Sequence, residues 1–382
     1  MSATVAVNAE VESRRLVSLD VFRGLTVFLM IVVNCCGPDS FRQLQHSPWN
    51  GWTLTDLVFP SFLFIGGVSL TLSFESRLRH GKSRAALLPH ILRRSVIIFA
   101  LGMILNAFPY FRLASWRIPG VLQRIAICYL ICAILYLWTG TRTRWAVIIA
   151  LLVGYWLLMR FVPVPGFGVP TVDVPMLDPD RNLAAWLDRR LMMGHLYEHV
   201  RDPEGLLSTI PAIANTLFGV AAGEWIRQLG EEPARLLRRL VVVGVACFAA
   251  GELWGLIFPI NKKLWTSSFA LLTVGLAMLA LAACYWFLDV KRLRGRWTAV
   301  PLVFGTNTIF AYALSEFVAI SMVTTRMQTG DGPINVKQAL SAYSFDYISR
   351  PEWSELGYAL FYATFCWFCT WLLYRRKIFL RI

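Results

Sequence analysis

Residues 16–36 read LVSLDVFRGLTVFLMIVVNCC, an apolar run interrupted by one acidic and one basic residue. A helix rises about 1.5 Å per residue, so roughly 20 residues match the thickness of the hydrocarbon core of a bilayer. Similar runs follow at about 53–75, 91–108, 119–138, 144–162, 207–227, 236–258, 265–289, 299–322 and 354–375. The pattern predicts an all-α, polytopic transmembrane helix bundle with about ten spans, in a single membrane domain over residues 16–382.

The overall composition agrees with a membrane protein. Hydrophobic residues make up 57% of the 382 and charged residues only 16%, whereas soluble domains carry about 25% charged residues. The net charge of +14 would indicate nucleic-acid binding if the basic residues formed a patch on a soluble fold. They stand instead in short connectors, where the positive-inside rule and anionic lipid explain them. We therefore expect membrane lipid among the partners and no nucleic acid.

The Lys and Arg residues are divided unevenly between alternate connectors. Of the 37, 22 fall on the side that carries the N-terminus, 13 fall on the other side, where the loops are longer, and Arg23 and Arg124 lie within spans. Because positively charged connectors stay in the cytoplasm, this bias places both termini there and makes residues 1–15 a cytoplasmic tail.

Two long connectors fall on the outer side. The first, about 163–206, is predicted to contain an amphipathic helix at the membrane surface. Its apolar positions are Leu183, Trp186, Leu187, Leu191 and Leu196. His195 and His199 stand at a spacing that can hold a metal, but no third ligand is nearby, so we expect no metal. The second connector, about 323–353, contains QTGDGP and predicts a flexible loop.

The first span carries polar residues at both ends. Ionisable side chains at membrane depth are costly and are therefore candidates for function. Asp20 and Arg23 stand one helical turn apart near the inner end. They either pair within the helix and neutralise each other, or Arg23 offers its donors to a phosphate entering from the cytoplasm. Asn34, at the outer end, either caps the helix or orients a substrate.

The connector after the first span holds the side chains best suited to proton transfer. From residue 46 it reads HSPWNGWTLTDLVFP, so His46 precedes Trp49 and Asn50, and Asp56 follows ten residues after it. Histidine exchanges protons near neutral pH, and a carboxylate can fix its tautomer and stabilise the imidazolium. The alternative is an interfacial histidine within an aromatic belt.

Three further polar residues stand in later spans. Arg124 lies toward the outer end of the fourth span, and Asn307 and Glu316 lie on the ninth. Glu316 would suit a carboxylate that orients a cationic amine substrate. It would equally suit a pair with Arg124 that only holds helices together. The spacing leaves both interpretations open.

Six stretches resemble the heparan-α-glucosaminide N-acetyltransferase family, transmembrane enzymes that use acetyl-CoA to acetylate terminal glucosamine. They are SLDVFRGLTVFLMIVVN, HSPWNGWTLTDLVFPSFLFIGGVSLTLS, RIPGVLQRIAICY, DPEGLLSTIPAIANTLFGVAAG, INKKLWTSSFALLT and GTNTIFAYALSE. They follow the family's order over nearly the whole chain. The second stretch is long and specific, whereas the SLDxFRG start is shared with wider groups of membrane acyltransferases.

The resemblance implies the roles of the candidate residues. It places the catalytic histidine at His46, an asparagine important for activity at Asn34, and the aspartate that follows the WNG turn at Asp56. We expect the acetyl donor, acetyl-CoA, to be bound by Asp20, Arg23 and Arg124. We expect the amino-sugar acceptor to be bound by Trp49, Asn50, Asn261, Asn307 and Glu316. The family also implies a homodimer.

The sequence departs from the animal members in two respects. They carry a large luminal domain before the multi-span part, where this sequence has a short tail. This difference favours a small amino sugar over polymeric heparan and a bacterial-type member in the inner membrane. The interval from Asn34 to His46 is about one residue longer, which leaves their relative geometry open.

Two chemical routes fit the predicted topology, which puts Asn34 and His46 at the outer face while acetyl-CoA is made in the cytosol. In the first, His46, oriented by Asp56, takes a proton from the sugar ammonium and the amine attacks the thioester directly. In the second, His46 is the nucleophile and becomes acetyl-imidazole. We favour the first, because a general base suffices for attack on a reactive thioester. Asn34 would then donate a hydrogen bond to the oxyanion.

Two other functions fit the same residues. A transporter or a flippase for a lipid-linked sugar would use intramembrane charges such as Asp20, Arg23 and Glu316, and would not bind acetyl-CoA. An O-acetyltransferase of a cell-envelope glycan would keep the reaction class but would have to activate a hydroxyl, a harder task than deprotonating an ammonium.

Overall fold

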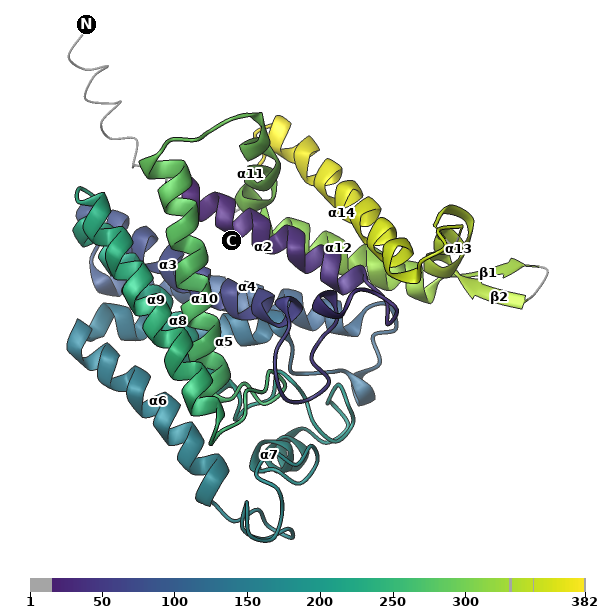
Figure 1. Cartoon of the computed structure of the whole chain (residues 1–382), viewed down its shortest axis with the longest axis horizontal. Helices are drawn as coiled ribbons and strands as arrows, with labels where there is room; N and C mark the ends of the chain where they lie inside the picture. Colours follow the sequence, from purple (N-terminus) through teal and green to yellow (C-terminus); the bar gives the residue numbers. More distant parts are fainter. Residues whose placement is uncertain (1–15, 330–331, 346, 381–382) are drawn as a thin grey trace, which may run out of the picture.

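The computed structural model describes residues 16–329, 332–345 and 347–380, most of which are helical (Figure 1). The helices are α2 Val17–Cys35, α3 Val58–Arg79, α4 Arg84–Ala107, α5 Val121–Trp138, α6 Thr141–Phe161, α7 Leu183–Met192, α8 Thr209–Leu229, α9 Pro233–Gly255, α10 Ser267–Tyr285, α11 Ala299–Thr306, α12 Thr308–Thr324, α13 Val336–Ser344 and α14 Pro351–Arg375. The strands β1 Arg326–Thr329 and β2 Gly332–Asn335 form an antiparallel hairpin. The predicted cytoplasmic tail, residues 1–15, lies outside the described residues.

Within the described residues, seven helices are long and apolar enough to cross a membrane. They are α2, α4, α5, α6, α14, the segment Leu54–Arg79 that contains α3, and the segment Ser267–Val290 that contains α10. The pair α11 and α12, bent by 77° at its break, makes an eighth if it is counted as one span. The predicted multi-pass helical architecture is therefore present. The count of ten spans and the cytoplasmic position of both termini stay predictions.

The other two predicted spans, 207–227 and 236–258, correspond to α8 and α9. Nearly every side chain of α8 from Thr209 to Ile226 is buried, and α3, α5, α6, α9 and α10 all pack against it. A helix that is surrounded by protein does not need a uniformly apolar surface. This position explains why α8 accommodates Asn215 and Glu224.

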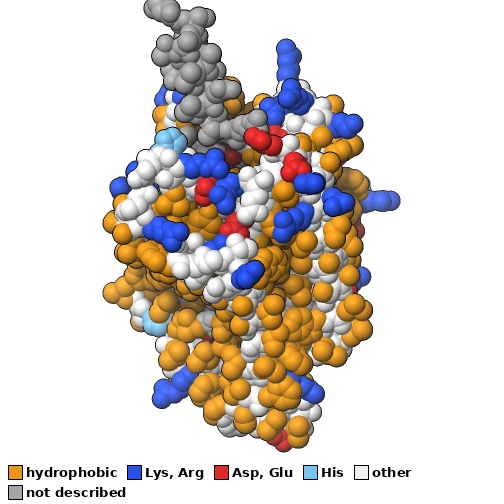
Figure 2. Space-filling view, turned by 90° about the vertical axis from the view of Figure 1, so that its left-hand side faces the viewer, with side chains coloured by type: hydrophobic (Ala, Val, Ile, Leu, Met, Phe, Trp, Pro, Cys, Tyr) orange, Lys and Arg blue, Asp and Glu red, His pale blue; other side chains and the backbone are white. Residues whose placement is uncertain are grey.

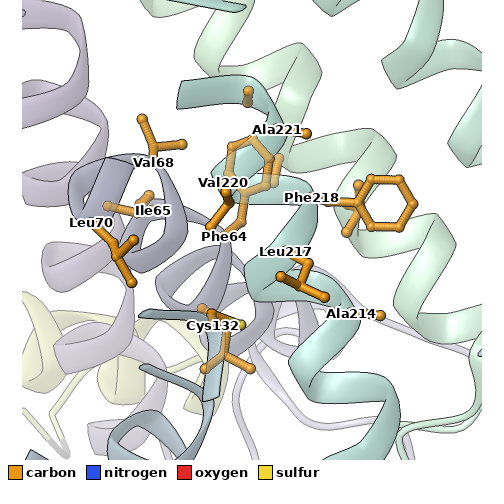
Figure 3. Packing of buried hydrophobic residues seen from close by; sticks show 14 of the residues in the cluster. Phe64, Ile65, Val68, Leu70, Cys132, Ala214, Leu217, Phe218, Val220 and Ala221 are labelled. Carbon is orange, nitrogen blue, oxygen red and sulfur yellow. The ribbon is translucent and has the colours of Figure 1, made fainter. Parts of the chain in front are cut away.

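The helices α3 and α8 approach each other backbone to backbone. A Cβ added at Gly67 would lie 2.0 Å from the carbonyl oxygen of Thr216, and one added at Gly219 would lie 2.0 Å from that of Phe64. Apolar side chains of both helices, with Cys132 of α5, fill the space around the crossing (Figure 3). Small residues allow membrane helices to pack this closely, so bulkier substitutions at either glycine would force them apart.

The helix α2 connects two apolar clusters. Its first half, with Leu19 and Phe22, belongs to a cluster with side chains of α3, α5, α8 and α10. Its second half, from Val27 to Val33, belongs to a cluster with side chains of α11, α12 and α14. Figure 1 shows α2 between these two groups of helices. The helix α2 as a whole therefore contacts both halves of the bundle.

The exterior of the bundle has a basic end and an apolar flank. Figure 2 shows Lys and Arg gathered on the upper part of one face and a nearly continuous apolar surface below them. Exposed basic residues at helix-connecting turns include Lys82, Arg84, Arg142, Arg235 and Arg238. Exposed apolar residues of α6 and α9 include Ile149, Leu157, Phe161, Val242 and Leu253. A flank of this kind is suited to contact with lipid acyl chains.

The two long connectors that the sequence predicted on the outer side differ in structure from what was expected. The amphipathic helix predicted in 163–206 is present as α7, but the side chains that α7 buries include Ala184, Ala185 and Met192, while Leu191 is 62% exposed. The prediction of a flexible loop over 323–353 is wrong for its described part. That part forms the β1–β2 hairpin and α13, whose first turn is closed by a reciprocal capping box between Asn335 and Gln338.

A buried ion pair joins α6 to α8. The guanidinium of Arg144 contacts the carboxylate of Glu224, and both side chains are less than a tenth exposed. We expect Glu224→Ala to lower the free energy of unfolding by about 3–5 kcal/mol, because the buried cation would lose its counter-charge. Denaturant titration of the protein in mixed micelles measures this change.

The matched control for this ion pair is Glu232→Ala, which removes the exposed pair between Arg235 and Glu232 (2.7 Å). Exposed pairs contribute about 0–1 kcal/mol. Equal losses of stability in the Glu224 and Glu232 variants would contradict a structural role for the buried pair.

Candidate active site

The turn between α2 and α3 is organised around the carboxylate of Asp56, which is fully buried. Its Oδ2 accepts hydrogen bonds from the backbone N–H of Ser47, from the backbone N–H of Thr53 and from Thr53 Oγ1, each at 3.1 Å. The contacts to Thr53 form a capping box at the start of the short helix Leu54–Leu57. These three hydrogen bonds fix the orientation of the carboxylate and leave its other oxygen, Oδ1, free for a different partner.

The other oxygen, Oδ1 of Asp56, lies 2.8 Å from Nδ1 of His46. The imidazole is about half exposed, with 54% of its side-chain surface accessible. Within the described residues, no hydrogen bond reaches its Nε2. Asp56 therefore holds one nitrogen of the ring and leaves the other available for proton transfer or nucleophilic attack.

A third side chain, Lys262 in the loop between α9 and α10, completes this group. Its Nζ lies 2.9 Å from His46 Nδ1 and 3.2 Å from Asp56 Oδ1. Burial lowers the pKa of Lys262 below the usual value for lysine, although the nearby Asp56 carboxylate acts to raise it. Sequence reasoning missed this residue. Lys262 lies in the stretch INKKLWTSS, one of those that resemble the family, but only Asn261 of this stretch was predicted to belong to the site.

The WNG turn is fastened to the same α9–α10 loop. The backbone N–H of Gly51 donates to the carbonyl oxygen of Ile260 at 2.8 Å, and Asn261 Nδ2 donates to Asn50 Oδ1 at 3.2 Å. Asn261 Oδ1 in turn accepts from the backbone N–H of Leu264 at 2.9 Å. Gly51 has φ of +95°, a conformation that glycine adopts readily. Asn50 and Asn261 thus bring Lys262 against His46.

The indole of Trp49 is also held by the protein. Its Nε1 donates to the carbonyl oxygen of Leu177 at 2.9 Å. The guanidinium of Arg201 lies 5.2 Å and the ammonium of Lys263 6.0 Å from the ring centroid. These contacts anchor the turn to the connector between α6 and α8 and to the α9–α10 loop.

Asn34 lies at the end of α2 and contacts α12. Its Nδ2 donates to Glu316 Oε1 at 3.1 Å. The predicted alternative partner of Glu316, Arg124, binds elsewhere, and no Lys or Arg pairs with Glu316 within the described residues. No hydrogen bond between Asn34 and His46 is formed, so the two predicted catalytic residues belong to separate groups in this structure.

Arg124 is almost fully buried in the first turn of α5, with 1% of its surface exposed. Its Nη2 donates to the carbonyl oxygen of Gly205 at 3.1 Å and to Ser208 Oγ at 2.5 Å. The guanidinium lies 5.0 Å from the ring centroid of Trp265. Arg124 thus joins α5 to the start of α8 next to the α9–α10 loop.

The ion pair between Asp20 and Arg23 is present, with 3.0 Å between the charged atoms. Arg23 also donates to Ser69 Oγ at 2.6 Å and to the carbonyl oxygen of Gly305 at 3.2 Å. The pair therefore links α2 to α3 and to the end of α11. The pairing within the helix that the sequence left as one of two alternatives is therefore present.

Asn307 stands at the break between α11 and α12, apart from the other predicted acceptor-binding residues. Its side chain binds the C-terminal segment, through Nδ2 to the carbonyl oxygen of Ile378 at 3.1 Å and from the N–H of Leu380 to Oδ1 at 3.0 Å. His195, whose spacing from His199 could hold a metal, places Nδ1 2.7 Å from the carbonyl oxygen of Trp116. Neither residue joins the group around His46.

Comparisons with known proteins match most of the chain. The family model described as "Heparan-alpha-glucosaminide N-acetyltransferase, catalytic" matches residues 15–250. The chain is 33% identical over 359 residues to heparan-alpha-glucosaminide N-acetyltransferase of Mus musculus, covering 80% of this chain and 54% of that protein. The Homo sapiens protein of the same name is 34% identical over 356 residues, covering 79% and 53%. The chain spans about half the length of these curated relatives. As its sequence motifs predicted, the chain belongs to the heparan-α-glucosaminide N-acetyltransferase family.

Proposed function

We propose that this protein transfers an acetyl group from cytosolic acetyl-CoA to the amine of an amino sugar at the outer face of the membrane. The observation that carries the proposal is the pair His46–Asp56, held at 2.8 Å through Nδ1, with about half of the imidazole side chain exposed. A histidine oriented by a buried carboxylate is suited to take a proton from an attacking amine. Family membership supports the reaction class.

The favoured route is direct attack of the amine on the thioester with His46 as general base. In it, the C–N bond forms, the C–S bond breaks and the CoA thiolate leaves. Asn34 has two amide hydrogens, of which one is donated to Glu316, so the second can stabilise the oxyanion. The alternative route, with His46 as acetyl acceptor, uses Nε2 of the same imidazole.

Several finer assignments belong to this proposal. They are CoA binding by Asp20, Arg23 and Arg124, two cytoplasmic termini, a bacterial inner membrane and a homodimer. The gathering of basic residues on one end of the bundle, seen in Figure 2, supports the orientation.

A transporter for amino sugars is the second candidate function, and one observation favours it. The helices α11 and α12 are bent by 77° at their break, next to the polar group of Asp20 and Arg23. Broken helices with polar groups at the break form substrate sites in many transporters.

Turnover of acetyl-CoA by the purified protein tests the proposal. The acceptors are glucosamine, other amino sugars and neutral glycans, and the products are identified by mass spectrometry. N-acetylated amino sugar with release of CoA is the expected result. Transfer only to hydroxyl groups would replace the proposal with O-acetylation, and absence of acetyl-CoA binding would favour transport.

Rapid-quench trapping with labelled acetyl-CoA distinguishes the two routes. In the absence of an acceptor, direct attack predicts no label on the protein. A labelled His46 would exclude direct attack and establish the acetyl-imidazole route.

We expect Glu316→Gln to raise the KM for the amine acceptor by about tenfold or more, with little change in kcat. The glutamine keeps an oxygen for Asn34 but loses the negative charge that attracts an ammonium, and a charged hydrogen bond contributes about 1.5–3 kcal/mol. Steady-state kinetics with glucosamine measures both constants. Glu231→Gln, which alters an exposed carboxylate in the turn between α8 and α9, is the control. An unchanged KM would remove Glu316 from the acceptor site.

A further inference from the structure

Lys262 contacts the His46 imidazole at Nδ1, and within the described residues no hydrogen bond occupies Nε2. The three atoms Lys262 Nζ, His46 Nδ1 and Asp56 Oδ1 form a nearly equilateral triangle, with sides of 2.8, 2.9 and 3.2 Å. Each side is short enough for a hydrogen bond. The chemistry of the group therefore depends on where its hydrogens lie.

If Lys262 is an ammonium, hydrogen bonds cannot form along all three sides of this triangle. If Nδ1 carries a hydrogen toward Asp56, the ammonium of Lys262 faces an N–H and has no acceptor there. If Nδ1 instead accepts from Lys262, its lone pair is directed away from Asp56 and the 2.8 Å contact lacks a hydrogen. A neutral amine satisfies every side: Nδ1–H is shared between Asp56 Oδ1 and the lone pair of Nζ, and an N–H of Lys262 donates to Oδ1.

The reaction proposed above releases a proton that must leave the site. An amino sugar is an ammonium near neutral pH, and its acetylation reads R–NH3+ + CH3CO–S–CoA → R–NH–CO–CH3 + CoA–SH + H+. The nitrogen loses two protons, of which the departing thiolate takes one. The first proton leaves before the amine can attack, and the second leaves after the C–N bond has formed. A neutral imidazole that has taken the first proton must therefore pass it to another acceptor before it can take the second and give it to the thiolate.

We propose that Lys262 is this second acceptor: as Nε2 of His46 takes a proton from the acceptor ammonium, Nδ1 passes its own proton to the neutral amine of Lys262. The imidazole is neutral before and after this step, and Lys262 becomes an ammonium paired with Asp56. The Lys262 side chain is 19% exposed, so water can then remove the proton. This inference rests on the proposed acetyl transfer.

The surroundings of Lys262 contain charges of both signs. Asp56 and His46 contact it, Glu204 acts on it from the loop before α8, and Lys263 is its neighbour in the chain. Asp56 and Glu204 favour the ammonium, whereas Lys263 and burial favour the neutral amine. The net effect is a lowered pKa. Because Lys262 loses its proton as pH rises, kcat should increase with pH until the amine is neutral.

Two substitutions at this position separate a proton acceptor from a structural cation. Lys262→Met should lower kcat by about 10- to 100-fold, less than the factor of about 10²–10⁴ that a general acid or base in contact with the substrate provides. Lys262→Arg keeps a cation beside Asp56 but cannot release a proton, so its kcat should be as low. Trimethylamine, which cannot be N-acetylated, should restore activity to Lys262→Met in proportion to its free-base concentration.

The control is Lys82→Met, which removes an exposed lysine in the turn between α3 and α4, away from the group around His46. It should keep the kcat and pH profile of the unmodified protein within about threefold. Near-normal activity of Lys262→Arg, together with no effect of trimethylamine on Lys262→Met, would overturn the proposal and leave Lys262 as a counter-charge for Asp56.

Nitrogen NMR of the lysine side chains tests the same inference without turnover. The 15Nζ signal of Lys262, identified by its loss in Lys262→Met, should have the shift of a neutral amine at pH 8. A shift typical of an ammonium would contradict the proposal. If no acceptor is acetylated by the unmodified protein, the proposed function fails, and the NMR signal still decides whether Lys262 is a neutral proton acceptor.

Discussion

Replacing His46 by alanine should abolish acetyl transfer, with kcat lowered by at least the factor of about 10²–10⁴ that general acid–base catalysis provides. The variant loses Nε2 but keeps the rest of the turn, because Asp56 Oδ2 still accepts from Ser47 and Thr53. Acetyl-CoA binding and the free energy of unfolding should therefore change little. Steady-state release of CoA, isothermal titration with acetyl-CoA and denaturant titration measure these three quantities.

The control for His46 is His80→Ala, since His80 is exposed at the end of α3 and places Nδ1 2.6 Å from Ser76 O, a contact within its own helix. It should be fully active. Retained turnover in His46→Ala would remove the catalytic assignment, and a large loss of stability would show that the ring acts through the fold.

Asp56→Asn should lower kcat by about 10³–10⁴-fold, comparable to the loss for the carboxylate of a serine-protease triad. Three donors converge on the Oδ2 side of this residue, so the asparagine oxygen should occupy that side and its NH2 group should face His46. That NH2 group would donate to Nδ1 and move the imidazole hydrogen to Nε2, which then could no longer accept a proton. The protein should remain folded, because the capping contacts survive.

Kinetics of N-acetylglucosamine formation and histidine 15N NMR together examine this second substitution. The NMR spectrum should show the opposite imidazole tautomer. Asp180→Asn, which alters an exposed carboxylate paired with Arg201, serves as the control. A fully active Asp56→Asn protein would contradict the orienting role, and an active protein with an unchanged tautomer would show that Asp56 does not select it.

The sequence predicted the helices well because membrane spans are long and repetitive in composition. Each of the ten predicted apolar runs overlaps an observed helix or, for 299–322, the broken pair α11 and α12. Hydropathy alone does not separate α8, which is buried among other helices, from spans that face lipid. The segment 323–353 was misread because a hairpin and a short capped helix depend on local hydrogen bonds that composition does not report.

Only part of the candidate site could be predicted from the sequence. His46 and Asp56 lie ten residues apart in one turn, so their contact follows from local spacing. Lys262 reaches the same group from more than 200 positions away in sequence, through the contacts of Asn50, Gly51 and Asn261 that fasten two loops together. Pairings between distant loops are fixed by tertiary packing, and a single sequence does not report them.

Proteoliposomes with labelled acetyl-CoA sealed inside and glucosamine outside test the central claim most directly, after selection of vesicles in which the basic end of the protein faces the lumen. The account predicts N-acetylglucosamine carrying the label in the external medium, formed by the unmodified protein and not by His46→Ala. Glucosamine that accumulates inside the vesicles without being acetylated, or external product formed equally by both proteins, would contradict it.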